Sequence, residues 1–506
     1  MKTKWKAIHL AFLLFVCWLP VQALAAAPVH LTVLHMNDLH GHIRPYIDKN
    51  LSSDTPVSGA AYFAGMIQEE RSANPEGVLL LSAGDMFQGT PVSNVFHGEP
   101  VIRIMNHLRF DAMAIGNHEF DWGLEALDRL RSLAQFPFLS ANVSDGSGGG
   151  LPGVKPYVLL TRKDLRIAVI GVTTPETPYS TKPANVSGLV FSDPAKAIRP
   201  LIKDVRKQGA KFIIVLSHLG LDADKRLADR VRGINLIVGG HTHTVMNDPL
   251  KVRATVIAQA GSYGVYLGVM QLKIDPKTGS IVDYTARNEL KRVFAAPNTP
   301  MDAQTAQIVD EYENKVKAEF ARVVGETRVD LVRRADGESN VGDLVGDSMR
   351  EASGAEIAFQ NGGGIRVDLP SGKITMEMVY TLLPFDNQLV TMDLKGKQIV
   401  AVLEWSVASG SKILQVSGIN VTYDMSRPPG SRVTAVQIHN EPLKLDADYR
   451  VVTNDFLAAG GDRFQVFMEG KNPVFGDPIR DAFTAYLRKH TPVNPQVENR
   501  VIFIQQ

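Results

Sequence analysis

The chain has 506 residues, which is more than one ordinary domain holds and predicts two or more domains. Its hydrophobic content of 44% and charged content of 21% are typical of a globular protein with substantial apolar cores. The formal net charge of +1 argues against binding a nucleic-acid polymer or a membrane surface by bulk charge, so an acidic substrate must be held by local charge or by metal.

Residues 1–25 are predicted to be a secretory signal peptide. Lysines near the start precede an apolar stretch from Ala7 to Leu19, and residues 23–25 fit a small-x-small cleavage site. The stretch is short and ends at Pro20, which favours a cleaved signal over a membrane anchor. Because the only cysteine, Cys17, lies inside the signal, the mature chain is expected to have no disulfide. We therefore expect a periplasmic or secreted protein, free of the membrane after cleavage.

Strands and helices are expected to alternate through residues 28–298. The apolar runs that predict strands are residues 31–36, 77–82, 112–115, 139–143, 165–172, 212–216, 234–238, 256–260 and 266–274. The helical periods are residues 60–71, 100–108, 122–134, 194–208 and 222–231. Strands that alternate with helices indicate an α/β domain, although the late strand pairs look antiparallel.

The character of the chain changes after residue 298. Pro297-Asn298-Thr299-Pro300 is a break, and residues 302–323 then show a helical period with many charges. Histidines become rare beyond this point, which indicates that the two parts do different jobs. We expect a first domain at 28–298, a linking helix and hinge at 299–325, and a second domain at 326–506.

Five apolar runs of the first domain end in polar residues. The segments at these ends are Asn37-Asp38-Leu39-His40, Gly84-Asp85, Gly116-Asn117-His118-Glu119-Phe120-Asp121, Ser217-His218 and Gly239-Gly240-His241-Thr242-His243. A core has no use for so many polar groups unless each finds a partner. We therefore expect the fold to bring these five strand ends to one place.

The polar residues at these ends form a donor set without sulfur. Its members are Asp38, His40, Asp85, Asn117, His218, His241 and His243. Nitrogen and oxygen donors suit Zn, Mn, Co or Fe(II) better than Ca. Seven donors are too many for one tetrahedral ion, and with a bridging carboxylate they suit two ions about 3.5–4 Å apart. A single histidine of this kind is more often structural, but the combination is hard to explain that way.

These motifs, in this order, resemble the calcineurin-like metallophosphoesterases. The form Gly116–Asp121 narrows the resemblance to the bacterial 5′-nucleotidase / UDP-sugar hydrolase family, as do three segments beyond residue 326. Those segments are Asn361-Gly362-Gly363-Gly364-Ile365-Arg366, Leu383-Pro384-Phe385 and Asn454-x-Phe456-x-x-x-Gly460-Gly461-Asp462. The resemblance covers nearly all of the mature chain. It implies a four-layer domain of two mixed sheets flanked by helices, followed by a second α/β domain that binds substrate.

The resemblance also implies a role for each metal donor. One ion would be held by Asp38, His40, Asp85 and His243. The other would be held by Asp85, Asn117, His218 and His241, with Asp85 as the bridge. His118 would face the reacting phosphate as a catalytic residue oriented by Asp121, and Glu119 would be structural. Two divalent ions, Zn, Mn or Co, are therefore the expected cofactors.

A nucleotide substrate follows from the same resemblance. It implies contacts to the base from Phe385, Phe456 and Asn361, to the ribose from Asp462, and to the phosphate from Arg366. Gly363, between two other glycines, lets the backbone approach a ligand closely. Family members also carry an arginine before the segment that is Glu338–Gly342 here. Since Arg333 and Arg334 both lie there, base preference and reach to a diphosphate stay open.

The function predicted is that of an exported 5′-nucleotidase, which releases phosphate and nucleoside by attack of a metal-bridging hydroxide. Nucleotide-sugar or dinucleotide pyrophosphatase activity is a further option. The alternatives are a 2′,3′-cyclic nucleotide 2′-phosphodiesterase/3′-nucleotidase of the same architecture, a sulfur-oxidation hydrolase, and a periplasmic solute-binding protein. The aromatic pair favours nucleotides over sulfur compounds, and solute binding alone does not need seven metal donors. Either a monomer or a homodimer fits the sequence.

Overall fold

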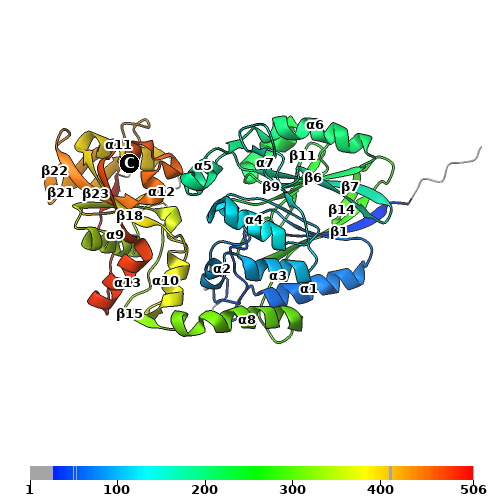
Figure 1. Ribbon diagram of the computed structural model, residues 1–506, viewed down its shortest axis with the longest axis horizontal. Helices are drawn as coiled ribbons and strands as arrows, with labels where there is room; N and C mark the ends of the chain where they lie inside the picture. Colours follow the sequence, from blue (N-terminus) through cyan, green and yellow to red (C-terminus); the bar gives the residue numbers. More distant parts are fainter. Residues whose placement is uncertain (1–26, 49–50, 53, 335, 409–412, 505–506) are drawn as a thin grey trace, which may run out of the picture.

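The computed structural model describes residues 27–48, 51–52, 54–334, 336–408 and 413–504, and shows two halves side by side (Figure 1). The predicted signal peptide lies outside the described residues. Within them, no helix combines the length and the apolar character that crossing a membrane requires.

The first sheet of the N-terminal half has the order β14-β13-β1-β2-β3-β4. Its strands are β1 (Val29–Met36), β2 (Val78–Ser82), β3 (Ala112–Ala114), β4 (Phe138–Leu139), β13 (Tyr266–Ile274) and β14 (Ile281–Arg292). Strands β1 to β4 pair in parallel, whereas β13 and β14 are antiparallel to their neighbours. Because parallel strands end at the same edge of a sheet, the segments after β1, β2 and β3 meet there.

The second sheet has the order β11-β12-β10-β9-β7-β6. Its strands are β6 (Tyr157–Arg162), β7 (Leu165–Thr173), β9 (Phe212–His218), β10 (Leu236–Gly239), β11 (Leu250–Val252) and β12 (Thr255–Ala258). The four central strands are parallel and the two edge strands antiparallel. His218 and the segment from Gly239 to His243 therefore lie at the carboxyl ends of neighbouring strands.

The two sheets pack face to face, and helices cover both outer faces (Figure 1). Val33 and Leu81 of the first sheet share an apolar layer with Ile214 of the second. The outer helices are α1 (Ala60–Ala73), α3 (Glu99–His107) and α4 (Gly123–Leu133) on one side, and α6 (Pro194–Lys207) and α7 (Leu221–Arg230) on the other. This confirms the predicted four-layer domain with two mixed sheets.

The prediction of a single strand at 139–143 is wrong in detail. It divides into β4 and a separate strand β5 (Val143–Ser144), which pairs with β8 (Val190–Phe191) in a small sheet of its own. The reason is that the polar residues between them bind across to β7. The Ser140 hydroxyl lies 2.8 Å from the Thr173 hydroxyl, and Asn142 donates to the Thr173 carbonyl.

The helix α8 (Ala303–Phe320) runs along the lower edge of the N-terminal half and leads into the second half (Figure 1). It begins where Asp302 accepts a hydrogen bond from Thr305 N at 2.7 Å, which satisfies one of the free donors of the first turn. Its apolar face packs into the same core as α1 and α3. The Tyr312 hydroxyl adds a hydrogen bond of 2.6 Å to Glu99.

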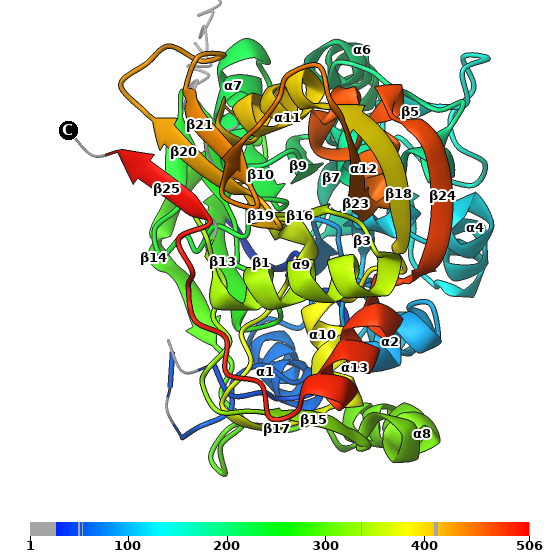
Figure 2. The same ribbon diagram turned by 90° about the vertical axis from the view of Figure 1, so that its left-hand side faces the viewer.

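The C-terminal half is built on a sheet of order β19-β16-β23-β18-β24, with β18 and β24 side by side in Figure 2. The strands of this sheet are β16 (Ile357–Asn361), β18 (Gln388–Lys395), β19 (Leu414–Ser417), β23 (Asp448–Asn454) and β24 (Lys471–Pro478). Smaller sheets contain β15 (Val323–Thr327), β17 (Gly372–Thr375), β20 (Asn420–Asp424), β21 (Val433–Ile438), β22 (Glu441–Pro442) and β25 (Val501–Ile504). The longer helices are α9 (Asn340–Ser353), α10 (Met376–Leu382), α11 (Gly396–Ala408) and α13 (Ile479–His490).

A buried carboxyl in α9 makes the stability of this half depend on pH. Burial raises the pKa of Asp343 to about 8, and the neighbouring Arg500 only partly offsets it. The folded chain thus holds a proton that the unfolded chain releases near pH 4. We expect the free energy of unfolding to fall by about 1–3 kcal/mol between pH 5 and pH 8 from this group. Urea titrations at both pH values should show a smaller fall for Asp343→Asn, whereas the exposed control Asp222→Asn should match the unmodified chain.

Candidate active site

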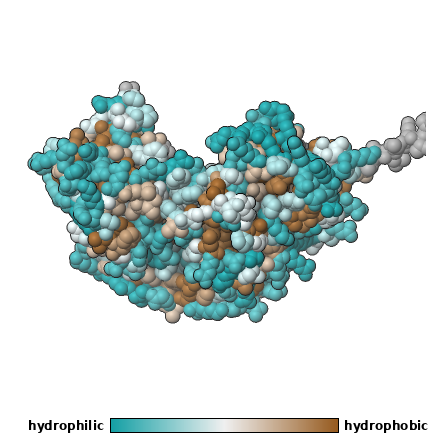
Figure 3. All heavy atoms as spheres, turned by 45° about the horizontal axis from the view of Figure 1, so that its top comes forward, coloured by the Kyte–Doolittle hydropathy of each residue, from teal (hydrophilic) through white to brown (hydrophobic). Residues whose placement is uncertain are grey.

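A cavity of about 480 Å³ lies between the two halves, where the molecular surface is hollowed (Figure 3). Most of the predicted site residues line it. From the N-terminal half these are Asp85, Asn117, His118, Asp121, His241 and His243, and from the C-terminal half Asn361, Gly363, Arg366, Phe385, Phe456 and Asp462. The remaining predicted residues, Asp38, His40 and His218, are buried behind the wall.

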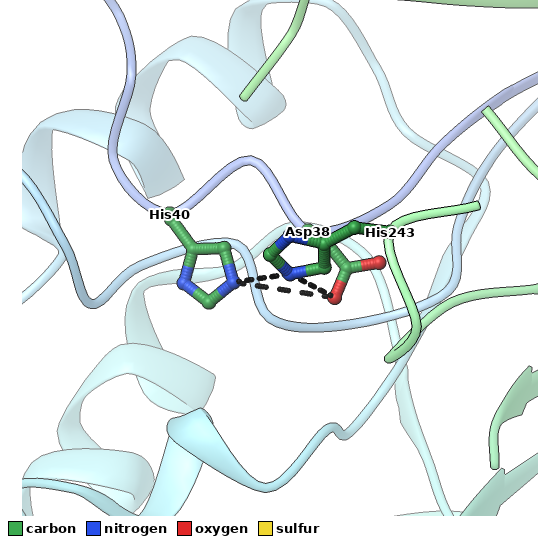
Figure 4. A group of neighbouring side chains, drawn as sticks. All are labelled: Asp38, His40 and His243. Carbon is green, nitrogen blue, oxygen red and sulfur yellow. Dashed lines mark hydrogen bonds and ion pairs between the residues drawn. The ribbon is translucent and has the colours of Figure 1, made fainter. Parts of the chain in front are cut away.

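The first group of donors contains Asp38, His40 and His243, which point towards one another (Figure 4). The Nε2 atoms of the two histidines are 3.2 Å apart. His243 Nε2 lies 3.4 Å from Asp38 Oδ1, and His40 Nε2 lies 4.0 Å from the same oxygen. Two imidazole nitrogens and a carboxylate oxygen that converge in this way are suited to holding a cation.

The second group of donors contains Asp85, His218 and His241. His218 Nε2 lies 2.9 Å from Asp85 Oδ2, and the same oxygen lies 4.0 Å from His40 Nε2 of the first group. Asp85 therefore stands between the two groups. Beside it, Asn117 Oδ1 is buried without a hydrogen-bond partner among the described residues. A buried oxygen without a partner is costly, and a cation would satisfy it.

Two histidines of these groups are held by main-chain carbonyls. His40 Nδ1 lies 2.8 Å from the Gln88 carbonyl, and His218 Nδ1 lies 2.7 Å from the Ala83 carbonyl. A carbonyl only accepts, so each Nδ1 carries a proton, and in the neutral ring the lone pair is then on Nε2, which faces its group. Metal-binding histidines are usually oriented by this kind of contact. The residues present therefore fit a pair of divalent cations.

Five of the donors have a strained backbone. The φ angles of Asp38, His40, Asp85, His241 and His243 lie between +50° and +76°. This left-handed region is uncommon for residues other than glycine and costs about 1–3 kcal/mol each, a strain that is concentrated at functional sites.

Close packing of glycine and Glu119 fixes the loop that carries Asp85. A Cβ on Gly116 would lie 2.1 Å from Asp85 Oδ1, so no larger residue fits there. Glu119 accepts hydrogen bonds from three main-chain nitrogens, those of Asp85, Met86 and Gly116, at 2.7–2.9 Å. Glu119 thus holds two strand ends together, in keeping with the structural role expected for it.

His118 and Asp121 form a hydrogen-bonded pair at the cavity wall. His118 Nδ1 lies 2.6 Å from Asp121 Oδ2, and the His118 ring is 5.6 Å from the ring of Phe385 across the cavity. Burial opposes a charge on His118, but the carboxylates of Asp121 and Asp85 outweigh it and raise the pKa of His118 above 6.5. The hydrogen bond and the charge of Asp121 thus favour the protonated form of the ring.

The part of the cavity wall that belongs to the C-terminal half contains both polar and aromatic side chains. Asn361, the last residue of β16, donates to Asp462 Oδ2 at 3.3 Å and accepts from Asn454 at 2.9 Å. The guanidinium carbon of Arg366 lies 5.8 Å from the Phe385 ring centre. Phe456 stands in the same wall, at the start of the segment that leads to Asp462.

Gly461 leaves the space that the Phe456 ring occupies. A Cβ on Gly461 would lie 2.6 Å from that ring. If Phe456 stacks on a base, Gly461→Ala should raise the KM for AMP about tenfold, because stacking on an aromatic is worth ~1–3 kcal/mol. Steady-state kinetics with AMP and with p-nitrophenyl phosphate, which has no base, should show the change for AMP alone. Gly150→Ala, at a glycine with open space around it, should leave both substrates unaffected.

Several cavity residues are not among the predicted site residues. They are Gln88, Trp122, Ser180, Thr181, Lys182, Asn185, Pro384, Asp386 and Asn387. Pro384, Asp386 and Asn387 flank the predicted Phe385, and Gln88 closely follows Gly84-Asp85, so these four lie beside motifs of the sequence. Both polar atoms of the Gln88 side chain are buried without a partner in the described part of the chain. Neither Arg333 nor Arg334 lines the cavity, and each pairs with a nearby aspartate instead.

The chain matches two family models and several known proteins. A family model described as calcineurin-like phosphoesterase matches residues 31–245, and one described as 5′-nucleotidase, C-terminal domain, matches residues 323–469. The 5′-nucleotidase of Bos taurus is 32% identical over 535 residues, which cover 95% of this chain and 92% of the relative. The trifunctional nucleotide phosphoesterase protein YfkN of Bacillus subtilis (strain 168) is 32% identical over 93% of this chain, but that match spans only 35% of the relative.

A solved structure agrees over almost the whole chain. The crystal structure of a 5′-nucleotidase precursor from Thermus thermophilus has a TM-score of 0.87 and 36% sequence identity, and it covers 94% of this chain and 100% of that chain. Calcineurin-like metallophosphoesterases use divalent metals, and this chain contains two groups of side chains that are suited to binding such ions. The chain therefore belongs to the 5′-nucleotidase family and is a phosphoric monoester hydrolase, with a calcineurin-like domain followed by a 5′-nucleotidase C-terminal domain.

Proposed function

We propose that the protein is an exported, metal-dependent 5′-nucleotidase that releases phosphate and nucleoside from nucleoside 5′-monophosphates. The observation that carries this proposal is the cavity that joins the two donor groups to Phe385 and Phe456. Membership of a hydrolase family argues against the solute-binding alternative, which needs no such donors.

The donor groups are proposed to hold two divalent cations, Zn, Mn or Co. One would be held by Asp38, His40, Asp85 and His243, and the other by Asp85, Asn117, His218 and His241. When bound, such ions neutralise phosphate charge and lower the pKa of a coordinated water towards neutrality. Support comes from the unpartnered Asn117 oxygen and from the carbonyls that direct the Nε2 lone pairs.

His118 and Asp121 are proposed to act on the reacting group itself. A cationic His118 would donate a hydrogen bond to a phosphoryl oxygen or to the leaving ester oxygen, where negative charge develops. Asp121 would hold the ring in place through Nδ1.

The C-terminal half is proposed to bind the rest of the nucleotide. Phe385 and Phe456 would stack on the base, Asn361 would contact its edge, and Asp462 would accept from the ribose hydroxyls. Arg366 would fork onto the phosphate, and Gly363 would let the main chain approach it. These groups face the same cavity as the donor groups, so substrate binding and hydrolysis take place at one site.

We also propose the division into domains 28–298 and 326–506, with a linking helix and hinge at 299–325. In support, α8 packs against α1 and α3 of the first half and also contacts α10 of the second, and the chain passes from α8 to β15 within two residues. A rotation of the second domain about this connection would carry substrate to the donors.

Cleavage of residues 1–25 on export is part of the proposal, and mass spectrometry of the mature protein tests it.

A panel of substrates tests the activity. Purified protein with added Mn, Zn or Co is expected to release phosphate from AMP, and a chelator should abolish the release until metal returns. UDP-glucose tests the pyrophosphatase option. 2′,3′-cyclic AMP tests the phosphodiesterase alternative, which the trifunctional relative keeps open. Activity on 2′,3′-cyclic AMP without any on AMP would replace the proposal with that alternative.

A further inference from the structure

A short segment, residues 176–186, lies between the catalytic pair and the second domain. It contains α5 (Thr177–Ser180) and η2 (Pro183–Val186), and Figure 1 shows α5 at the edge of the N-terminal half nearest to α12 (Asp455–Ala458). We call this segment the connector. Its sequence carries no motif, yet part of it lines the cavity.

Thr181 of the connector holds the catalytic pair. Its hydroxyl donates to Asp121 Oδ1 at 2.6 Å, while Asp121 Oδ2 lies 2.6 Å from His118 Nδ1. Each oxygen of the carboxylate thus has one short contact, and together these contacts fix its rotation. Thr181 is only 2% exposed, so water does not compete for the bond. Hydrogen bonds to a charged acceptor are stronger than those between neutral groups.

Two more contacts join the connector to the same loop. The Ser180 carbonyl accepts from Asn117 Nδ2 at 3.0 Å, which turns the unpartnered Asn117 oxygen away from the connector and leaves it for a cation. Asn185 Nδ2 donates to the carbonyls of Phe120 and Asp121 at 3.0 Å and 2.7 Å. The connector therefore contacts the loop before, within and after η1 (His118–Phe120).

The opposite side of the connector binds the second domain. Lys182 Nζ lies 2.7 Å from Asp455 Oδ2, which is buried. Arg463 forms an ion pair with Glu176, and its guanidinium carbon lies 5.0 Å from the ring centre of Tyr179.

The partners in the second domain directly adjoin the proposed nucleoside contacts. Asp455 precedes Phe456, and Arg463 follows Asp462. The loops that would bind base and ribose are thus the loops that bind the connector. A shift of these loops would change the support of the connector, and through Thr181 the orientation of Asp121 and His118.

We propose that Thr181 is a positioning residue for the catalytic pair, and that Lys182 makes its position depend on the second domain. His118 is then aligned when the nucleoside-binding loops stand over the metal donors, and less well aligned when they move away. This inference rests on the proposed roles of His118 and Asp121.

Thr181→Val, which keeps the shape and removes the hydroxyl, tests the first part. The kcat for AMP should fall about tenfold with KM within about twofold, because alignment of an acid–base group affects the chemical step. Thr181→Ser, which restores the hydroxyl, should recover most of kcat. A kcat within twofold of the unmodified enzyme, or a serine variant as defective as the valine variant, would overturn the proposal.

Lys182→Met tests the dependence on the second domain and removes only a partly exposed charge. The kcat for AMP should fall about fourfold alone, but less than about twofold in the Thr181→Val background, because the two residues act through one contact. Additive losses, or a raised KM with unchanged kcat, would show that Lys182 acts independently and would refute the coupling. Lys489→Met, which removes the exposed pair with Glu351, is the matched control.

A second substrate separates this inference from the proposed function. Thr181→Val should lose about the same factor with p-nitrophenyl phosphate, since His118 serves any phosphate ester. If the unmodified enzyme hydrolyses this ester but not AMP, the nucleotidase proposal fails. The ratio between the variants then still decides whether Thr181 positions the pair.

Discussion

Asp85→Asn is expected to lower kcat/KM for AMP by about 10⁴-fold and to leave fewer than about two metal ions per chain. Asp85 is the donor that stands between the two groups, with one oxygen 2.9 Å from His218 and 4.0 Å from His40. An amide in its place keeps the size and one acceptor oxygen but loses the negative charge that is proposed to bind both cations. Elemental analysis of protein purified without chelator, together with phosphate release, measures both effects.

Folding has to be separated from metal loss in this variant. Asp85 Oδ1 also accepts from His118 N at 2.9 Å, a bond that the asparagine oxygen can still make. The circular dichroism spectrum should therefore match that of the unmodified chain. Asp222→Asn, at an exposed residue of α7, controls for the loss of a carboxylate elsewhere. Full hydrolysis by Asp85→Asn would contradict the proposed two-metal site.

His118→Asn is expected to lower kcat for AMP by about 10²–10⁴-fold while metal content stays at the level of the unmodified enzyme. His118 touches the cavity and Asp121 but belongs to neither donor group. Its loss should therefore remove a hydrogen-bond donor to the reacting group and leave the cations in place.

The metal measurement decides the role of His118. A variant that loses activity and metal together would make His118 a part of the metal site and end its proposed catalytic role. Asp121→Asn provides a graded comparison, because it keeps a hydrogen-bond partner for Nδ1 but removes the charge. We expect its kcat to lie between those of His118→Asn and the unmodified enzyme, again with full metal content.

The N-terminal fold, and the meeting of the candidate donors at one edge, could be predicted because each of these residues follows a buried strand. Parallel strands end at one edge, so residues far apart in sequence, such as Asp38 and His243, meet there. The end of a strand is marked in the sequence by a change from apolar to polar residues. This change can be recognised without knowing which strands are neighbours in the sheet. The left-handed backbone at these donors was not predictable, because it depends on contacts between loops.

The other cavity residues were hard to identify from the sequence, because tertiary contacts bring them to the cavity. Thr181 and Lys182 lie in a short irregular stretch, and their partners Asp121 and Asp455 are distant in sequence. Nothing local distinguishes a threonine that holds a carboxylate from one on an ordinary loop. Arg333 and Arg334, before α9, are the opposite case. The sequence indicated them as candidate substrate contacts, whereas in the structure each forms an ion pair with a nearby aspartate.

Within the described residues, the chain crosses between its two halves once, between α8 and β15. The loops around Phe385, Phe456 and Asp462, which are proposed to accept the leaving alcohol, therefore touch the N-terminal half mainly through contacts such as those of Asp455 and Arg463 with the connector. If the proposed roles hold, a change of leaving-group preference would have to keep Asp455 and Arg463, or the catalytic pair would lose part of its support.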